Sequence, residues 1–264
     1  MWFNSKDITL LILQKESIMR ITRYIPNAFT MANLFCGMLG TFFAATGRLD
    51  FAAYAVVLGI FFDFFDGFFA RMFKVEGELG LQLDSLADVV TSGVVPGMVM
   101  FQLLHKLEHW NTGERWVEAG LSWDSLSFLP FLGFAITLAS AFRLAKFNID
   151  TRQTTSFIGL PTPANALLIV SLPLIVQFQD IALAESLITN TWFLLALTAL
   201  SCFMLNAEVP LFALKFKSWG LAENKVRYGF LLLACILLFW LTFLAIPLII
   251  LLYVLLSLVT KNQI

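Results

Sequence analysis

The chain has 264 residues, of which 59% are hydrophobic and only 13% are charged. Ordinary soluble domains carry roughly 25% charged residues, so this composition excludes a soluble enzyme, a disordered chain and a nucleic-acid-binding protein. The 17 Lys and Arg residues nearly balance the 18 Asp and Glu residues, so any electrostatic recognition has to depend on local groups and not on net charge.

Long apolar runs predict an all-α integral membrane protein, because about 20 apolar residues are needed to span a bilayer as one helix. We expect spans near residues 28–46, 50–74, 84–105, 127–147, 160–178 and 189–206. The tail at 228–260 would reach ~50 Å as one helix, which is too long for one span. We expect it to fold back near Ala245-Ile246-Pro247 as two short spans, giving eight in total, with one long kinked helix as the alternative.

Positive side chains are distributed unevenly between the two sides of the predicted membrane domain. If the N-terminus is cytoplasmic, only Arg48, Lys106 and Arg115 lie on the far side, and the other 14 of the 17 Lys and Arg residues face the cytoplasm. Because positively charged loops stay cytoplasmic, we predict a multi-pass protein of the inner membrane with a cytoplasmic N-terminus.

Residues 1–264 are expected to form a single membrane domain in three parts. Residues 1–27 form a cytoplasmic or interfacial segment, 28–206 a six-helix core, and 207–264 a cytoplasmic loop with one or two C-terminal spans. The stretch before Met19 either forms an interfacial amphipathic helix or precedes a translation start at Met19.

Four carboxylates interrupt the apolar sequence between residues 60 and 90, namely Asp63, Asp66, Asp84 and Asp88. Each costs about 2.5–3.5 kcal/mol at the centre of a membrane helix, so something has to neutralise them. The first two are three residues apart and the last two are four apart, so each pair shares one helix face. A turn at Glu76-Gly77-Glu78 sets the two helices side by side and antiparallel, so the two pairs face each other at matching depth.

Hard oxygen ligands that converge in a low-dielectric site favour Mg²⁺ or Mn²⁺, either one ion or two ions bridged by phosphate. Arg71 lies nearer the interface, where its planar guanidinium suits a lipid phosphate, and Gly67 and Gly80 leave room for a bulky ligand. Other interpretations stay open. The acids can serve a proton relay or a cation transporter, the glycines can be helix-packing positions, and Arg71 can be an interface anchor.

These residues follow the pattern D-x2-D-G-x2-A-R-x8-G-x3-D-x3-D, in which the chain resembles the CDP-alcohol phosphatidyltransferase family. The resemblance implies a six-helix catalytic core, usually in a homodimer, in which a hydroxyl acceptor displaces CMP from a CDP-linked lipid or alcohol. It implies that Asp63, Asp66 and Asp84 bind the metal ions and the CDP. Asp88 would bind metal and take the acceptor's proton, while Gly67 and Arg71 would contact the nucleotide phosphates, with Gly80 beside them.

Three further segments are similar to the membrane-integral phosphatidylserine synthases of that family, namely residues 23–37, 142–148 and 157–164. This narrower resemblance implies transfer of the phosphatidyl group from CDP-diacylglycerol to L-serine, which gives phosphatidylserine and CMP. Glycerol 3-phosphate or an inositol phosphate is the alternative acceptor. Membrane lipids are expected partners, and nucleic acid is not.

Polar residues outside the acidic stretch are candidates for substrate binding. Asn27, Thr30 and Asn33 lie three residues apart on one helix face, where they can hydrogen-bond the cytosine and ribose, or Asn27 can cap the helix end. Near the cytoplasmic end of the fourth predicted span lie Arg143, Lys146, Asn148 and Arg152. These residues can hold an acceptor that carries a carboxylate, although a plain positive-inside loop would look similar.

Overall fold

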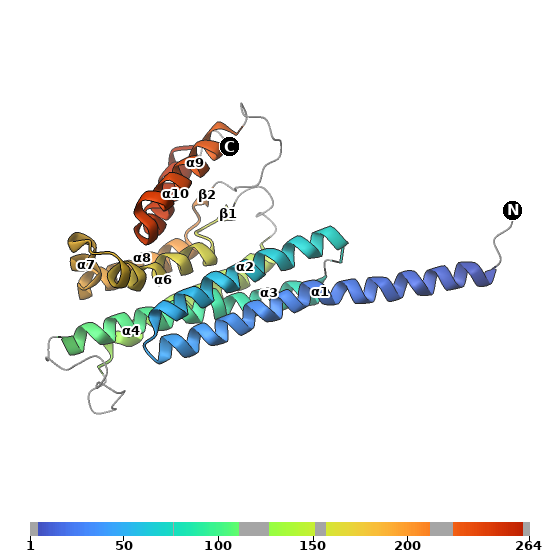
Figure 1. Ribbon diagram of the computed structural model, residues 1–264, viewed down its shortest axis with the longest axis horizontal. Coiled ribbons are helices and arrows are strands. Elements are labelled where there is room, and N and C mark those ends of the chain that lie inside the picture. Colours follow the sequence, from blue (N-terminus) through green and yellow to red (C-terminus); the bar gives the residue numbers. More distant parts are fainter. Residues whose placement is uncertain (1–4, 76, 111–126, 151–156, 212–223, 261–264) are drawn as a thin grey trace.

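The computed structural model describes residues 5–75, 77–110, 127–150, 157–211 and 224–260, and nearly all of these residues are helical. α1 (Ser5–Ala45) and α2 (Leu49–Phe73) form a long antiparallel hairpin. α3 (Glu78–Asp88), the π-helical turn η1 (Val89–Val94) and α4 (Val95–Trp110) return beside it (Figure 1). The two helices that carry the acids therefore run in opposite directions, as predicted, and each packs against α1.

The second half of the chain consists of shorter elements. They are η3 (Leu129–Phe134), α5 (Ala135–Ile149), α6 (Thr162–Phe178), α7 (Ala182–Ile188), α8 (Thr191–Asn206), α9 (Lys225–Leu241), η4 (Thr242–Leu244) and α10 (Ala245–Thr260). Two short strands, β1 (Phe157–Ile158) and β2 (Pro210–Leu211), pair antiparallel. Gly159 follows β1 with a φ of +75°, and a Cβ there would lie 2.7 Å from the Leu205 carbonyl oxygen, so this close approach to α8 requires glycine.

Five helical segments in the described part of the chain are long and apolar enough to cross a bilayer, namely Tyr24–Ala45, Leu49–Phe73, Glu78–Leu107, Leu129–Ile149 and Lys225–Val259. The pair α7–α8, bent by 74°, makes a sixth if it counts as one span. The all-α membrane class is confirmed, but eight is more spans than helix length supports. α6 has 17 residues, and α9 and α10, the two halves of the Lys225–Val259 segment, have 17 and 16. These lengths lie at or just below the lower limit of about 17 residues for one span.

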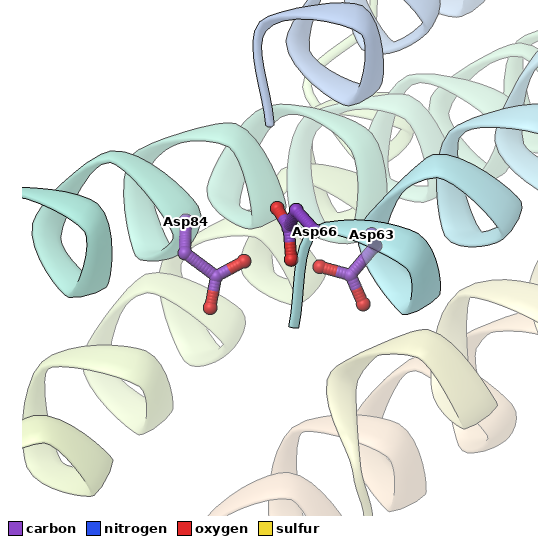
Figure 2. Close-up of side chains that lie close together, drawn as sticks. All are labelled: Asp63, Asp66 and Asp84. Carbon is purple, nitrogen blue, oxygen red and sulfur yellow. The ribbon is translucent and has the colours of Figure 1, made fainter. Parts of the chain in front are cut away.

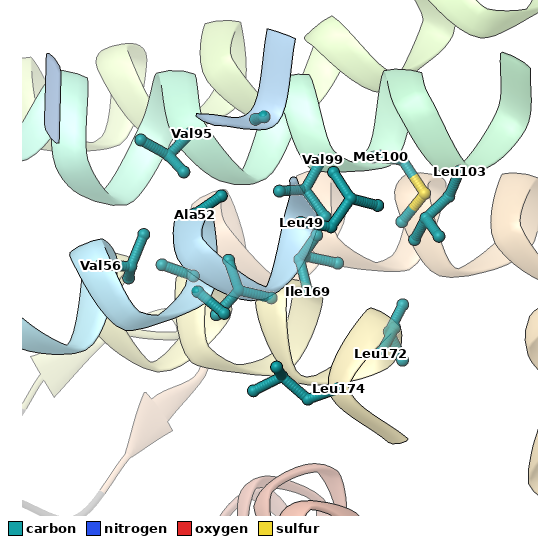
Figure 3. Packing of buried hydrophobic residues seen from close by; sticks show 14 of the residues in the cluster. Leu49, Ala52, Val56, Val95, Val99, Met100, Leu103, Ile169, Leu172 and Leu174 are labelled. Atoms are coloured by element: carbon teal, nitrogen blue, oxygen red, sulfur yellow. The ribbon is translucent and has the colours of Figure 1, made fainter. Parts of the chain in front are cut away.

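Small and branched side chains of α1, α2, α4 and α6 form the main core. Figure 3 shows part of it, where Val56 of α2, Val95 of α4 and Ile169 of α6 lie close together. Large apolar side chains instead cover the outer surface of α1 and α2, including Phe35, Phe42, Phe61, Phe64 and Phe68. A helix that is apolar on both its inner and outer faces is typical of a membrane span.

The tail folds back on itself, as predicted. The rings of Phe230 in α9 and Tyr253 in α10 are 6.0 Å apart between centroids, whereas residues this distant in one straight helix would lie ~35 Å apart. The break lies at Thr242, which has a φ of +44°. Gln179, just after α6, holds this turn, because its amide nitrogen donates to the Leu241 carbonyl at 2.8 Å and its amide oxygen accepts from the Leu244 N–H at 2.9 Å.

α1 extends well before the first predicted span. It begins at Ser5 and continues through Pro26, so the predicted boundary at residue 27 falls inside one continuous helix. The alternative in which Asn27 caps a helix is wrong, because a cap lies at a helix end and Asn27 lies in the interior of α1.

Candidate active site

Three of the four predicted acids lie together between α2 and α3. One carboxylate oxygen from each of Asp63, Asp66 and Asp84 lies within 4.8 Å of the other two, and in Figure 2 the three side chains point toward a common space. Asp88 follows Asp84 by one turn of α3, and its carboxyl lies within electrostatic range of the other three acids. The fold therefore gathers all four acids at one place inside the membrane domain, from positions up to 25 residues apart.

Polar side chains of α1 hold two of these acids. The Thr30 hydroxyl donates to Asp66 Oδ2 at 2.7 Å, and the Asn33 side-chain amide donates to Asp88 Oδ1 at 3.2 Å. Thr30 and Asn33 are both buried and lie three residues apart, which places them on the same face of α1. α1 thus fixes the orientation of one acid from each pair, a contact that was not anticipated for these two residues.

A cavity of about 380 Å³ opens beside the acids. Asp66 and Asp84 lie on its wall, and so do five residues predicted to bind the CDP group, namely Asn27, Thr30, Gly67, Arg71 and Gly80. Asn33, the sixth, does not line this cavity. A cavity with an arginine and two carboxylates on its wall has the charged groups that a metal-bound pyrophosphate needs.

The two glycines of the acidic stretch face open space in this cavity. A Cβ built on Gly67 would meet nothing nearer than Arg71 Nη1 at 3.6 Å, and one on Gly80 nothing nearer than Asn27 Oδ1 at 3.7 Å. By contrast, a Cβ on Gly37 of α1 would lie 3.0 Å from the Thr91 backbone nitrogen, so that glycine serves close helix packing. Packing does not require glycine at Gly67 or Gly80, which favours the interpretation that they leave room for a ligand.

A π-helical turn begins immediately after Asp88. The Thr91 hydroxyl donates to the Asn33 carbonyl at 3.1 Å, and the Thr137 hydroxyl donates to the Gly93 carbonyl at 2.9 Å, so η1 is tied to both α1 and α5. Such turns occur frequently at functional sites. Sequence reasoning did not single out Thr91; the available signal was a run of polar residues, Thr91-Ser92, inside an apolar span.

The predicted acceptor-binding residues of α5 separate into two groups. Arg143 is only 7% exposed, and it lies within electrostatic range of the Asp88 carboxylate. Lys146 instead forms an ion pair with Glu208 at 3.4 Å, and Asn148 exchanges hydrogen bonds with Ser85 at 2.9 and 3.2 Å. Arg152 lies outside the described residues. Among the described candidates, Arg143 is therefore the buried cation within electrostatic range of the acids, and Asn148 is held next to Asp84 through Ser85.

The acidic cluster suits a divalent cation. Carboxylate oxygens are the ligands that Mg²⁺ and Mn²⁺ prefer, and three of them converge here. Asp84 Oδ1 is buried and has no hydrogen-bond partner among the described residues. An unpaired carboxylate oxygen in apolar surroundings is costly unless a cation or proton neutralises it, so the residues present fit a bound metal ion.

Comparisons with known proteins agree with this geometry. A sequence profile described as CDP-alcohol phosphatidyltransferase matches residues 23–200. The chain is 35% identical over 147 residues to a CDP-diacylglycerol–serine O-phosphatidyltransferase of Helicobacter pylori, covering 55% of each chain. It is 32% identical over 153 residues to the enzyme of that name from Bacillus subtilis, covering 56% of this chain and 75% of the relative.

A more distant relative is an archaetidylserine synthase of Methanothermobacter thermautotrophicus, which is 28% identical over 170 residues, covering 62% of this chain and 65% of the relative. The match thus spans about half the length of the Helicobacter pylori relative. The profile match covers α2, α3 and the whole acidic cluster, and ends within α8, before the C-terminal hairpin of α9 and α10. The chain belongs to the CDP-alcohol phosphatidyltransferase family.

Proposed function

We propose that the protein transfers the phosphatidyl group of CDP-diacylglycerol to L-serine, giving phosphatidylserine and CMP. The observation that carries this proposal is the cluster of Asp63, Asp66 and Asp84 beside a cavity that also presents Arg71. The names of the relatives support serine as the acceptor, and so does a buried arginine, Arg143, beside Asp88.

Each residue has a distinct task in this reaction. Asp63, Asp66, Asp84 and Asp88 would hold Mg²⁺ or Mn²⁺, as one ion or two, which would supply positive charge that offsets the charge developing on the phosphates. Asp88 accepts the proton of the serine hydroxyl. The serine oxygen forms a bond to the phosphorus that carries diacylglycerol, and the bond from that phosphorus to the CMP oxygen breaks. Arg71 stabilises the departing CMP phosphate.

Binding of the two substrates uses different residues around the acids. The cavity with Asn27, Thr30, Gly67 and Gly80 receives the CDP group, and the acyl chains stay in the surrounding lipid. Serine lies on the side of α5, where Arg143 pairs with its carboxylate. We assign Asn33 to positioning Asp88, and Lys146, Asn148 and Arg152 to the entrance for serine. Most of the catalysis then comes from positioning and charge stabilisation. The homodimer implied by the family resemblance is part of this proposal.

A panel of acceptors tests the function. Purified protein with CDP-diacylglycerol and Mg²⁺ or Mn²⁺ is expected to release CMP at least about tenfold faster with L-serine than with glycerol 3-phosphate or an inositol phosphate, because a site built to pair with one polar group rejects ligands that lack it. Turnover with glycerol 3-phosphate but not serine would overturn the serine assignment and keep the family reaction. Ion flux in sealed vesicles without CMP release would instead favour a cation transporter.

The proposed orientation places the active-site opening and the N-terminus on the cytoplasmic side. In a variant without Cys36, Cys202 and Cys235, a cysteine introduced by Glu78→Cys is expected to react with a membrane-impermeant maleimide only from the cytoplasm. One introduced by Thr46→Cys, at the other end of α2, is expected to react only from outside. Both positions are exposed, so failure to react reflects sidedness and not burial. Labelling of Glu78→Cys from outside would reverse the orientation and contradict cytoplasmic synthesis.

A further inference from the structure

Asn33 of α1 is hydrogen-bonded to two residues of the segment that begins at Asp88. Its side-chain amide donates to Asp88 Oδ1 at 3.2 Å, and its backbone carbonyl accepts from the Thr91 hydroxyl at 3.1 Å. Asp88 is the last residue of α3, and Thr91 lies three residues later in η1. A single residue of α1 therefore holds this segment at two points, first at the acid and then one turn beyond it.

Thr91 is fully buried in a narrow space between two glycines. A Cβ on Gly37 of α1 would lie 3.0 Å from the Thr91 backbone nitrogen, and a Cβ on Gly59 of α2 would lie 2.6 Å from Thr91 Cγ2. The same Cβ on Gly59 would lie 2.9 Å from Asn33 Oδ1. These distances leave no room for a side chain at either position, so the two glycines allow Thr91 and Asn33 to reach each other.

The regular helix is interrupted where these contacts occur. Directly after Asp88, η1 replaces the hydrogen bonds of an α-helix by the wider bonds of a π-helical turn. The orientation of Asp88 therefore depends more on neighbouring helices than it would in an uninterrupted helix. The Asn33 amide oxygen is buried and has no hydrogen-bond partner within the described part of the chain, so the bond to Asp88 and the position of the Asn33 backbone together orient this side chain.

We propose that Thr91 is a positioning residue for Asp88 and acts through Asn33. This inference rests on the proposed function and adds a residue that the mechanism above does not use. The Thr91 hydroxyl holds the Asn33 backbone, and the Asn33 amide then holds the Asp88 carboxylate toward the acceptor hydroxyl whose proton it takes. Without the Thr91 hydroxyl the carboxylate is free to shift, and a displacement of about 1 Å is enough to slow a reaction by about a hundredfold.

Two variants at position 91 differ only in the hydroxyl. Thr91→Ala removes it and is expected to lower kcat by at least about tenfold, whereas Thr91→Ser keeps it and should stay within about threefold of the wild type. The KM for each substrate should change by less than about threefold in both variants, because the contact acts on the transition state and Thr91 does not line the cavity beside Arg71. Retained metal-dependent binding of CDP-diacylglycerol shows that each variant is folded.

Thr137→Ala is the matched control. The Thr137 hydroxyl also donates to a backbone carbonyl of this turn, that of Gly93, at 2.9 Å, but this bond ties η1 to α5 and does not involve Asn33. We expect a thermal unfolding midpoint similar to that of Thr91→Ala and a kcat within about twofold of the wild type. An equal loss of kcat in Thr137→Ala and Thr91→Ala would show that the turn needs only general support, and would overturn the inference.

Combined variants measure whether Thr91 acts through Asn33. Asn33→Ala removes the amide that donates to Asp88 and keeps the carbonyl that Thr91 contacts, so it should lower kcat by itself. In that background Thr91→Ala should change kcat by less than about twofold, because the two residues act as one unit. Losses that multiply, or a normal kcat in Thr91→Ala alone, would overturn the inference while the proposed function stands.

The proposed function fails in a different way, in the wild-type protein. Turnover with another acceptor and not with serine would refute the serine assignment, and the same kcat comparison made with that acceptor would then decide the role of Thr91. CMP release with none of the acceptors would refute both proposals.

Discussion

Replacing Asp66 or Asp84 by Asn is expected to lower CMP release by about a thousandfold or more, because each change removes a charged ligand from a shared metal cluster. Asn keeps the size and the hydrogen-bonding geometry of the side chain, so Thr30 can still donate to residue 66. The loss is therefore expected to come from the metal and not from unfolding. The measurement is CMP release at saturating CDP-diacylglycerol and serine, together with metal-dependent binding of CDP-diacylglycerol, which should weaken in parallel.

Asp88→Asn should behave differently from these two variants. Asp88 is not one of the three acids whose oxygens converge, and it accepts a hydrogen bond from Asn33. Its main proposed task is therefore to take the proton of serine. We expect turnover to be lost while more of the binding of CDP-diacylglycerol is kept. Asp50→Asn is a matched control, since Asp50 lies in the first turn of α2, the helix that carries Asp66, and pairs with Arg48. Normal turnover in Asp66→Asn would contradict the assignment of the cluster.

Much of the architecture could be predicted because it depends on local composition. The apolar runs located α2, α6 and α8 within a few residues, although α1 begins at Ser5, far before the predicted start at 28. The length of the tail favoured a fold-back. The position of the fold-back was less accurate: the chain breaks at Thr242, before the predicted Ala245-Ile246-Pro247. Pro247 lies in the first turn of α10, where a helix tolerates proline because that N–H has no intrahelical partner, so proline begins the second helix and does not form the turn.

Other features depend on contacts between distant segments and could not be predicted from one sequence. Gln179 holds the turn of the tail through residues more than 60 positions away. The bend of 74° between α7 and α8 lies at Asn190, which caps α8 by accepting from the Trp192 and Phe193 N–H groups, although the apolar sequence on both sides suggests one span. The π-helical turn after Asp88 is stabilised by Thr91 and Thr137 from different elements, which a local pattern does not reveal.

The acids could be located from the sequence because their cost in a membrane makes any cluster conspicuous, and because fixed spacing places them on helix faces. The residues of α5 were harder to interpret. Arg143, Lys146 and Asn148 occur within six positions, but a helix turns by 100° per residue, so they point in different directions. Only the packed structure distinguishes a guanidinium beside Asp88 from a lysine that pairs with Glu208.

The second large loss of activity is expected when Arg143 is replaced. Arg143→Ala is expected to raise the KM for serine by about a hundredfold or to abolish serine-dependent turnover, because a buried charge-assisted pair is stronger than an exposed one and the Ala variant leaves the carboxylate of serine unpaired. Binding of CDP-diacylglycerol should change by no more than a few fold, since Arg143 does not line the cavity beside Arg71. The measurement is the KM for each substrate. Arg48→Ala is an arginine control, since Arg48 directly precedes α2, at the end opposite Arg71.

A lysine at the same position makes the test sharper. Arg143→Lys keeps the charge but loses the planar fork that binds a carboxylate through two parallel hydrogen bonds, so we expect partial recovery relative to Arg143→Ala, with a serine KM between those of Arg143→Ala and the wild type. Such a series indicates recognition of a carboxylate by charge and geometry together. If Arg143→Ala instead weakened CDP-diacylglycerol and serine binding equally, Arg143 would support the acidic cluster as a whole through Asp88, and serine would have to be recognised by other groups of the site.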